Sequence, residues 1–251
     1  MTGRHTNILE LLTERQKMEV TQLAELLGVS QVTVRKDLDQ LEAKGLVRRV
    51  HGCAVIGSSD DLNNRLAYHY DSKKKIAQAA AADVRDGETV MIESGSCCAL
   101  LAEELASKKR DITIVTNSAF IAGYIRTAPH ARVILLGGEY QPESQVLVGP
   151  VARKCAQEFF VDKLFIGTDG FHEQSGFTAG NLMRAETVKA MAEQANQVII
   201  LTESEKFSQQ GVVSLLRLEQ VSRVVTDDGI PESAEQALVS HGIEVHKISI
   251  G

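Results

Sequence analysis

The stretch SQVTVRKDLDQL, residues 30–41, decides the fold of the first part of this 251-residue chain. Its apolar residues Val34, Leu38 and Leu41 fall at the i, i+4 and i+7 positions of a helix that buries one side. Ser30 precedes them and is a residue type that commonly caps a helix N-terminus. The segment predicts a helix that begins after Ser30 and turns its polar side chains away from a small core.

Upstream of this stretch, the pattern predicts two further helices. Apolar residues at helical spacing indicate a helix over residues 6–14, and residues 17–20 form a short extended piece. Thr21 is the expected N-cap of the second helix. Gly28 is expected to end it, because glycine tolerates the left-handed conformation of a helix C-terminus.

Downstream, Gly45 is expected to end the third helix, and a short basic hairpin follows. Residues 46–50 and 54–56 are rich in β-formers and are expected to be strands around the turn at residues 51–53. Three helices, a short glycine-containing turn and a hairpin are typical of a winged helix-turn-helix. Residues 1–57 are therefore predicted to form a small α+β DNA-binding domain.

The polar side of the third helix and the hairpin carry the side chains expected to contact DNA. Gln and Arg can pair bidentately with base edges, and a Thr methyl group can contact thymine. Lys36 and the basic residues of the hairpin are better suited to phosphates. An ordinary solvated helix face is the alternative, which the basic hairpin disfavours. The predicted DNA-binding residues are Gln31, Thr33, Arg35, Lys36, Arg48, Arg49 and His51.

Asp37 is an unusual charge for a helix that approaches DNA. We expect it to point inward and to pair with a base such as Arg35 or Arg48, because a buried carboxylate needs a compensating partner.

The composition limits the classes of protein that remain. The net charge is −6, but residues 1–57 hold eight Lys/Arg and seven Asp/Glu, so they carry +1 and the remainder −7. No apolar run approaches the roughly 18 residues that span a bilayer, and no signal segment is visible, so a cytoplasmic protein without membrane contact is expected. The four cysteines lack paired zinc spacing, and no metal or cofactor is expected. Cys97-Cys98 could be a redox pair, although two small side chains on a tight loop is the simpler interpretation.

After a polar linker at residues 58–72, residues 73–251 predict a second domain. Short apolar runs alternate with helical stretches, which is typical of a mostly parallel, open α/β sheet. The expected strands are residues 90–92, 112–115, 133–136, 164–166, 198–201, 224–225 and 245–248. The expected helices are residues 73–84, 98–108, 118–127, 150–160, 185–195 and 233–240.

Small and polar residues follow five of these expected strands. Ligands of open parallel sheets bind beyond the carboxyl ends of the strands, so these segments are expected to line one crevice. The first segment opens a helix, where backbone N–H groups favour an anion such as phosphate. Asn117 and Asp169 suit sugar hydroxyls, and Lys206 suits a phosphate or carboxylate. The five segments are residues 94–96, 116–118, 137–138, 167–170 and 202–206.

These residues carry a resemblance to a known family. Arg4, Ile8 and Leu12, followed by Ser30 and TVRKDL at residues 33–38, resemble the helix-turn-helix signature of the DeoR family of bacterial regulators. Gly45 and RVHGCA at residues 49–54 resemble that family's wing, with Cys53 in place of its usual second glycine.

The resemblance extends to the second domain, whose motif order is similar to the DeoR sensor domain and, through it, to ribose-5-phosphate isomerase and coenzyme A transferases. The resemblance implies a transcriptional regulator, and we expect a repressor of a carbohydrate-metabolism operon. It also implies that a phosphorylated sugar or related metabolite changes how this regulator binds DNA. Arg184 stands where the family commonly has an acid, which leaves the ligand's identity open. The effector-binding residues implied are Gly95, Ser96, Cys97, Asn117, Gly138, Asp169, Arg184 and Lys206.

Two other classes of function are compatible with parts of this sequence. A sugar-phosphate isomerase with an appended DNA-binding head needs a base beside the substrate carbonyl. Here His172 replaces the second acid of the isomerase pattern, so no catalytic residue is assigned. A scaffold that senses nothing is disfavoured by the crevice residues. Since one helix-turn-helix reads only a half-site of a double-stranded operator, a homodimer or homotetramer is expected.

Overall fold

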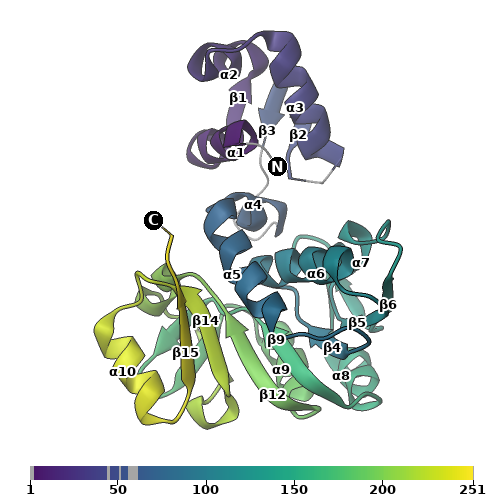
Figure 1. The fold of residues 1–251 in the computed structure, drawn as a ribbon, viewed down its shortest axis with the longest axis vertical. Coiled ribbons are helices and arrows are strands. Elements are labelled where there is room, and N and C mark those ends of the chain that lie inside the picture. Colours follow the sequence, from purple (N-terminus) through teal and green to yellow (C-terminus); the bar gives the residue numbers. More distant parts are fainter. Residues whose placement is uncertain (1–2, 44–45, 51, 56–61, 251) are drawn as a thin grey trace. The chain divides into compact units, whose positions relative to one another are not determined.

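A computed structural model describes residues 3–43, 46–50, 52–55 and 62–250, except for the side chains of residues 14, 63 and 64 (Figure 1). The chain divides into two compact units, Met1–Asp71 and Ser72–Gly251. Among the described residues, no helix combines the length and the apolar character needed to span a bilayer.

The first unit consists of helices packed beside a small antiparallel sheet, as expected for a winged helix-turn-helix. Its strands pair in the order β1-β3-β2, and buried Ile8, Leu12, Leu23, Val34 and Leu38 form its centre. Its elements are α1 (Gly3–Arg15), β1 (Lys17–Glu19), α2 (Val20–Leu27), α3 (Gln31–Ala43), β2 (Arg48–Val50), β3 (Cys53–Val55) and α4 (Leu62–Ala67).

The helix ends around the turn between α2 and α3 agree with the sequence in two places and differ in one. Gly28 ends α2 in the left-handed conformation, at φ 63°. Ser30 caps α3, because its Oγ accepts a hydrogen bond of 3.1 Å from the Thr33 N–H. The prediction of Thr21 as the N-cap of α2 is wrong. Glu19 takes that position in a reciprocal capping box with Gln22, which starts the helix earlier.

The second unit is built on a seven-stranded sheet in which all neighbouring strands run parallel, within the described part of the chain. Each of the seven expected runs overlaps one of its strands, with only Leu136 lying beyond the strand end, so the expected fold class is confirmed. The strands are β4 (Thr89–Ile92), β5 (Ile112–Thr116), β6 (Ala131–Leu135), β9 (Val161–Ile166), β12 (Ala195–Leu201), β14 (Arg223–Asp227) and β15 (Glu244–Ile248).

The order of these strands is β15-β14-β12-β9-β4-β5-β6. The chain therefore builds outward from β4 through β5 to β6, returns to β9 on the other side of β4, and builds outward again. The reversal between β4 and β9 is a topological switch point, the place where open α/β sheets commonly bind ligands.

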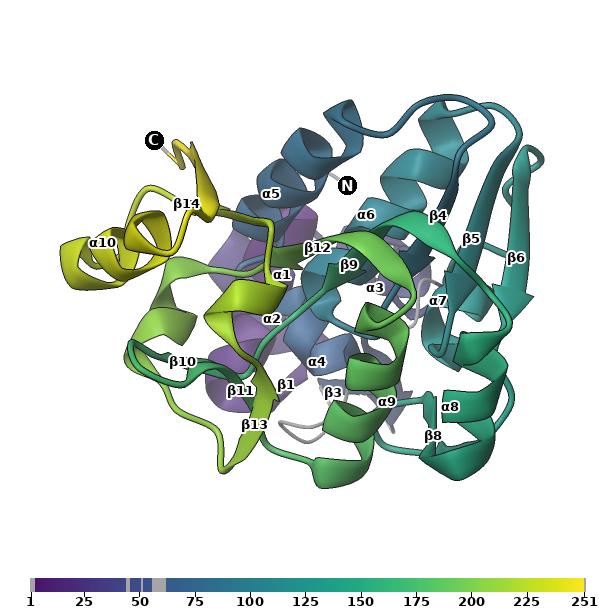
Figure 2. The same ribbon diagram turned by 90° about the horizontal axis from the view of Figure 1, so that it is seen from below.

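The helices of the second unit overlap the six expected ones, and α8 and α9 pack against each other (Figure 2). They are α5 (Tyr70–Ala82), α6 (Ser96–Lys108), α7 (Ala119–Tyr124), α8 (Gly149–Gln157), α9 (Leu182–Ala192) and α10 (Glu232–Ser240). The segment expected to be a linker, residues 58–72, contains α4 and the first residues of α5. Residues 58–61 lie outside the described part.

Several short elements go beyond the sequence prediction. The hairpin β7 (Glu139–Gln141) and β8 (Val146–Val148) follows β6. A small antiparallel sheet joins β10 (Gly170–His172), β11 (Gly176–Ala179) and β13 (Val213–Leu216). The 3₁₀ turns η1 (Ser204–Ser208) and η2 (Leu218–Gln220) flank β13. Phe171, Phe177 and Phe207 pack their rings together beneath this sheet, with centroids 5.2–6.5 Å apart.

The aromatic cluster provides a test of the packing. Phe177 is fully buried, so Phe177→Ala should lower the free energy of unfolding of the second unit by about 3–5 kcal/mol. Phe160 is 71% exposed, and Phe160→Ala should change it by no more than about 0.5 kcal/mol. Urea unfolding followed by circular dichroism measures both, and equal losses would contradict the assigned core.

Candidate nucleic-acid interface and ligand crevice

The recognition helix α3 exposes the polar residues that the sequence assigns to DNA. Gln31, Arg35 and Lys36 are exposed, whereas Val34 and Leu38 on the other side are buried. The Arg35 guanidinium lies 3.5 Å from the Gln31 side-chain oxygen, so the two side chains form one polar surface.

A groove of about 650 Å³ lies beside this helix and brings three predicted DNA-binding residues together. Gln31 and Arg35 line it from α3, and Arg49 lines it from the wing strand β2. Arg49 is held by an ion pair with Asp39 and by a 2.9 Å hydrogen bond from its backbone N–H to Glu42. Glu19 adds a negative charge to the same groove.

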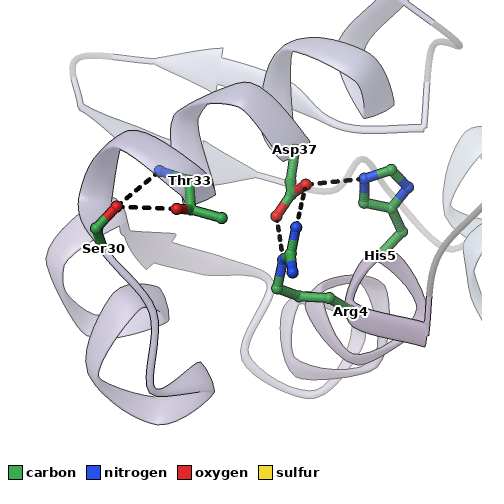
Figure 3. A network of polar contacts seen from close by, with 5 residues as sticks. All are labelled: Arg4, His5, Ser30, Thr33 and Asp37. Atoms are coloured by element: carbon green, nitrogen blue, oxygen red, sulfur yellow. Dashed lines mark hydrogen bonds and ion pairs between the residues drawn. The ribbon is translucent and has the colours of Figure 1, made fainter.

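The other described residues predicted to contact DNA, Thr33, Lys36 and Arg48, are not among those that line this groove. Lys36 and Arg48 are exposed. The Thr33 hydroxyl is engaged with Ser30 Oγ at 2.9 Å, which leaves its methyl group for an apolar contact (Figure 3). His51 lies outside the described residues.

Asp37 turns inward from α3, as expected, but the expected partners Arg35 and Arg48 are wrong. Its carboxylate accepts hydrogen bonds from Arg4 Nε at 2.5 Å and Arg4 Nη2 at 3.0 Å (Figure 3). His5 Nε2 lies 3.1 Å from Asp37 Oδ1. Both partners come from α1, because the buried side of α3 faces that helix while Arg35 points to solvent. The bidentate pair therefore fixes the recognition helix against α1.

The charges of this cluster shift two pKa values. The hydrogen bond from Arg4 lowers the pKa of Asp37 below its usual value, and the His5 contact adds to this, while burial acts the other way. The same hydrogen bond raises the pKa of Arg4.

Except for Arg184, the predicted effector residues follow the carboxyl ends of five parallel strands, which lie at one edge of the sheet. Gly95 precedes α6, and Ser96 and Cys97 form its first turn. Asn117 follows β5 and is 1% exposed; its Nδ2 donates to the Leu147 carbonyl at 3.2 Å, while its Oδ1 has no partner among the described residues.

The other predicted effector residues have local partners. Asp169 accepts a 2.9 Å hydrogen bond from the Gly180 N–H, and Lys206 donates to Gln209 at 2.9 Å. Arg184 lies in the first turn of α9, where its N–H is capped by Asn181. Gly138 has a packing role, because a Cβ there would stand 2.7 Å from the Val148 carbonyl oxygen.

Two features of this edge escaped sequence reasoning. Glu93, directly after β4, accepts hydrogen bonds from Ser94, Gly95 and Gly167. Lys73 of α5 and Glu203 after β12 form a buried ion pair of 3.0 Å. In the sequence, Glu93 and Glu203 cannot be told apart from ordinary polar loop residues that follow an apolar strand. Their contacts become visible only in the folded structure.

A second groove, of about 690 Å³, lies at the opposite edge of the sheet, at the amino ends of β4, β9, β12 and β14. Its charges pair with one another: Lys163 contacts Glu88 at 2.5 Å, and Arg223 contacts Asp83 and Glu244. These ion pairs indicate that the charged residues of this groove stabilise the fold rather than bind a ligand.

The Asp37 cluster predicts a pH dependence. A lowered pKa in the folded state means that the cluster stabilises the first unit above the usual aspartate pKa, near 3.9, and that this contribution is lost as the pH falls through the folded pKa. Asp37→Asn should therefore unfold the first unit at a lower temperature at pH 7, with a difference from the parent that narrows below about pH 4. Thermal unfolding followed by circular dichroism between pH 3 and pH 7 measures this, and a constant difference would contradict it.

The chain matches two family patterns. Residues 4–60 match the DeoR-like helix-turn-helix domain, and residues 68–228 match the DeoR C terminal sensor domain. The chain is 28% identical over 248 residues to a putative aga operon transcriptional repressor of Escherichia coli O157:H7, which covers 96% of this chain and 92% of that protein. It is 29% identical over 248 residues to the transcriptional repressor AccR of Agrobacterium fabrum, covering 94% and 96%.

Among solved structures, a probable sor operon regulator from Shigella flexneri aligns with a TM-score of 0.44 and 13% identity, covering 68% of this chain and 88% of that chain. Ribose 5-phosphate isomerase A from Methanocaldococcus jannaschii aligns with a TM-score of 0.40 and 20% identity, covering 55% and 54%. Since the two family patterns together span well over half of the chain, the protein belongs to the DeoR family and is a transcriptional regulator rather than an enzyme.

Proposed function

We propose that this protein is a cytoplasmic repressor of a carbohydrate-metabolism operon, and that a phosphorylated sugar or related metabolite controls its binding to the operator. The observation that carries the DNA-binding part is the groove where Gln31, Arg35 and Arg49 converge. Related regulators include one whose name refers to the aga operon, which favours a carbohydrate operon here as well.

Each residue of the interface has a separate role in this proposal. Gln31 and Arg35 read base edges in the major groove, and the Thr33 methyl group contacts a thymine. Lys36, Arg48 and Arg49 neutralise phosphates and set the register on the duplex. His51, in the wing turn, is assigned to a phosphate on sequence grounds alone.

The active form is a homodimer or homotetramer. A single recognition helix reads about half of an operator, and two-fold assembly places a second copy on a half-site one helical turn, or a multiple of it, away. The operator is then expected to be an approximate palindrome.

The effector site is the carboxyl edge of the parallel sheet, centred on the switch point between β4 and β9. Gly95, Ser96 and Cys97 border it from β4, Asn117 from β5, and Asp169 from β9. Lys206 and Arg184 supply positive charge at its margins. Gly138 supports the neighbouring loop by permitting its close approach to Val148.

The DNA interface is tested by Arg35→Ala, which should weaken binding to the operator by about 1–3 kcal/mol because one bidentate base contact is lost. Lys36→Ala should weaken operator and scrambled duplex equally, since phosphate contacts carry no sequence information. Arg85→Ala, an exposed charge of the second unit, is the matched control and should change neither affinity.

Fluorescence anisotropy at fixed salt measures these affinities, with an operator found by sequencing the genomic fragments that the protein retains. Full operator affinity in Arg35→Ala would remove Arg35 from the interface. Retained fragments unrelated to carbohydrate genes would contradict the assigned operon.

The effector site is tested by a thermal-shift panel of phosphorylated sugars, because a ligand that binds only the native state raises its melting temperature. Lys206→Ala should keep operator affinity but lose the shift and the release from DNA. An unchanged response would place the effector elsewhere, and no shift with any sugar would contradict a carbohydrate sensor.

A further inference from the structure

A single carboxylate joins the two strands of the switch point. Glu93 follows β4, and its Oε2 accepts the Gly95 N–H at 2.8 Å and the Gly167 N–H at 3.1 Å. Its Oε1 accepts the Ser94 hydroxyl at 2.7 Å. Gly95 continues from β4, whereas Gly167 follows β9, so the contacts connect loops 74 residues apart in the chain.

The two loops touch at this point. A Cβ on Gly95 would stand 3.1 Å from Gly167 Cα and 3.2 Å from Glu93 Oε2, closer than side chains normally pack. Glycine at position 95 therefore permits both the backbone contact and the approach of the carboxylate.

Two backbone N–H groups that converge on one oxygen form the arrangement with which proteins bind phosphate and other anions. In this protein the anion is already present, as the side chain of Glu93. The Gly95 N–H, which the sequence assigned to an effector anion, donates to this side chain instead.

We infer that Glu93 is an intrinsic anion that occupies the amide site of the switch point and excludes phosphate from it. The inference rests on the proposed function for the location of the effector site. A phosphate at the Gly95 and Gly167 amides would have to displace a tethered carboxylate or lie against it with the same sign of charge.

The acceptor atoms around Glu93 favour a ligand that brings hydrogen-bond donors to the centre of the site. A carboxylate offers about four acceptor positions, and Glu93 uses three of them in the contacts above. On the neighbouring strand, buried Asn117 Oδ1 is a further acceptor without a partner among the described residues. A sugar hydroxyl satisfies such acceptors, whereas the phosphate of the same effector requires donors other than the Gly95 and Gly167 amides.

The test uses inorganic phosphate on the full-length protein labelled with ¹⁵N at glycine. In the parent, the Gly95 and Gly167 amide signals should not respond to phosphate beyond the response to chloride at equal ionic strength. In Glu93→Ala, the freed amides should show shifts that saturate with phosphate. Ser94→Ala, which keeps the carboxylate on both amides, is the matched control and should behave as the parent.

Saturable shifts of these two signals in the parent would overturn the inference, as would their absence in a folded Glu93→Ala variant. If Glu93→Ala does not fold, Glu93→Gln removes the charge with little change in size, and it should respond to phosphate more than the parent does. These signals report the amide site whether or not any sugar releases the operator, so the result is separate from the test of the proposed function.

Discussion

The contact between β4 and β9 is the constraint on which the second unit depends. The chain reverses its direction of sheet growth there, so two strands far apart in sequence must be neighbours and their following loops must share one edge. Glu93 meets this requirement by accepting N–H groups from both loops, and Gly95 meets it by carrying no side chain. The seven described strands of this sheet run parallel, so the loops that follow them begin at this same edge.

The two units use a carboxylate in the same way. In the first, Asp37 accepts three contacts from α1 and so fixes the helix that presents Gln31 and Arg35. In the second, Glu93 fixes the loops on either side of the switch point. Each carboxylate accepts at least one hydrogen bond from a segment far from it in sequence, Arg4 for Asp37 and Gly167 for Glu93. Removing such a partner is costly, because the remaining groups stay buried without compensation.

The sequence was sufficient to predict the elements with strong periodicity, and insufficient for contacts made across the fold. Runs such as residues 198–201 are apolar enough to predict a buried strand, whereas strands of three residues, such as β7, are too short to show a period. The negative charge of Asp37, on a helix expected to approach DNA, indicates burial, but its partner Arg4 lies 33 residues earlier and only packing selects it. Glu93 was missed for the same reason. Residue type alone favours Thr21 as the N-cap of α2, whereas the reciprocal hydrogen bonds of Glu19 and Gln22 form only once the chain is folded.

The position of the unit boundary within helix α5 has a consequence for how such regulators recombine their domains during evolution. The boundary between the units, at residues 71 and 72, falls inside this helix rather than in a loop. Asp71, before the boundary, accepts a 3.2 Å hydrogen bond from Thr6 of α1, and Lys73, after it, pairs with Glu203. One residue inserted between them would turn one side chain by about 100° around the helix axis relative to the other. Recombination between relatives at this boundary therefore joins two parts of one helix, and the length of the joined helix sets the angle between these two side chains around its axis.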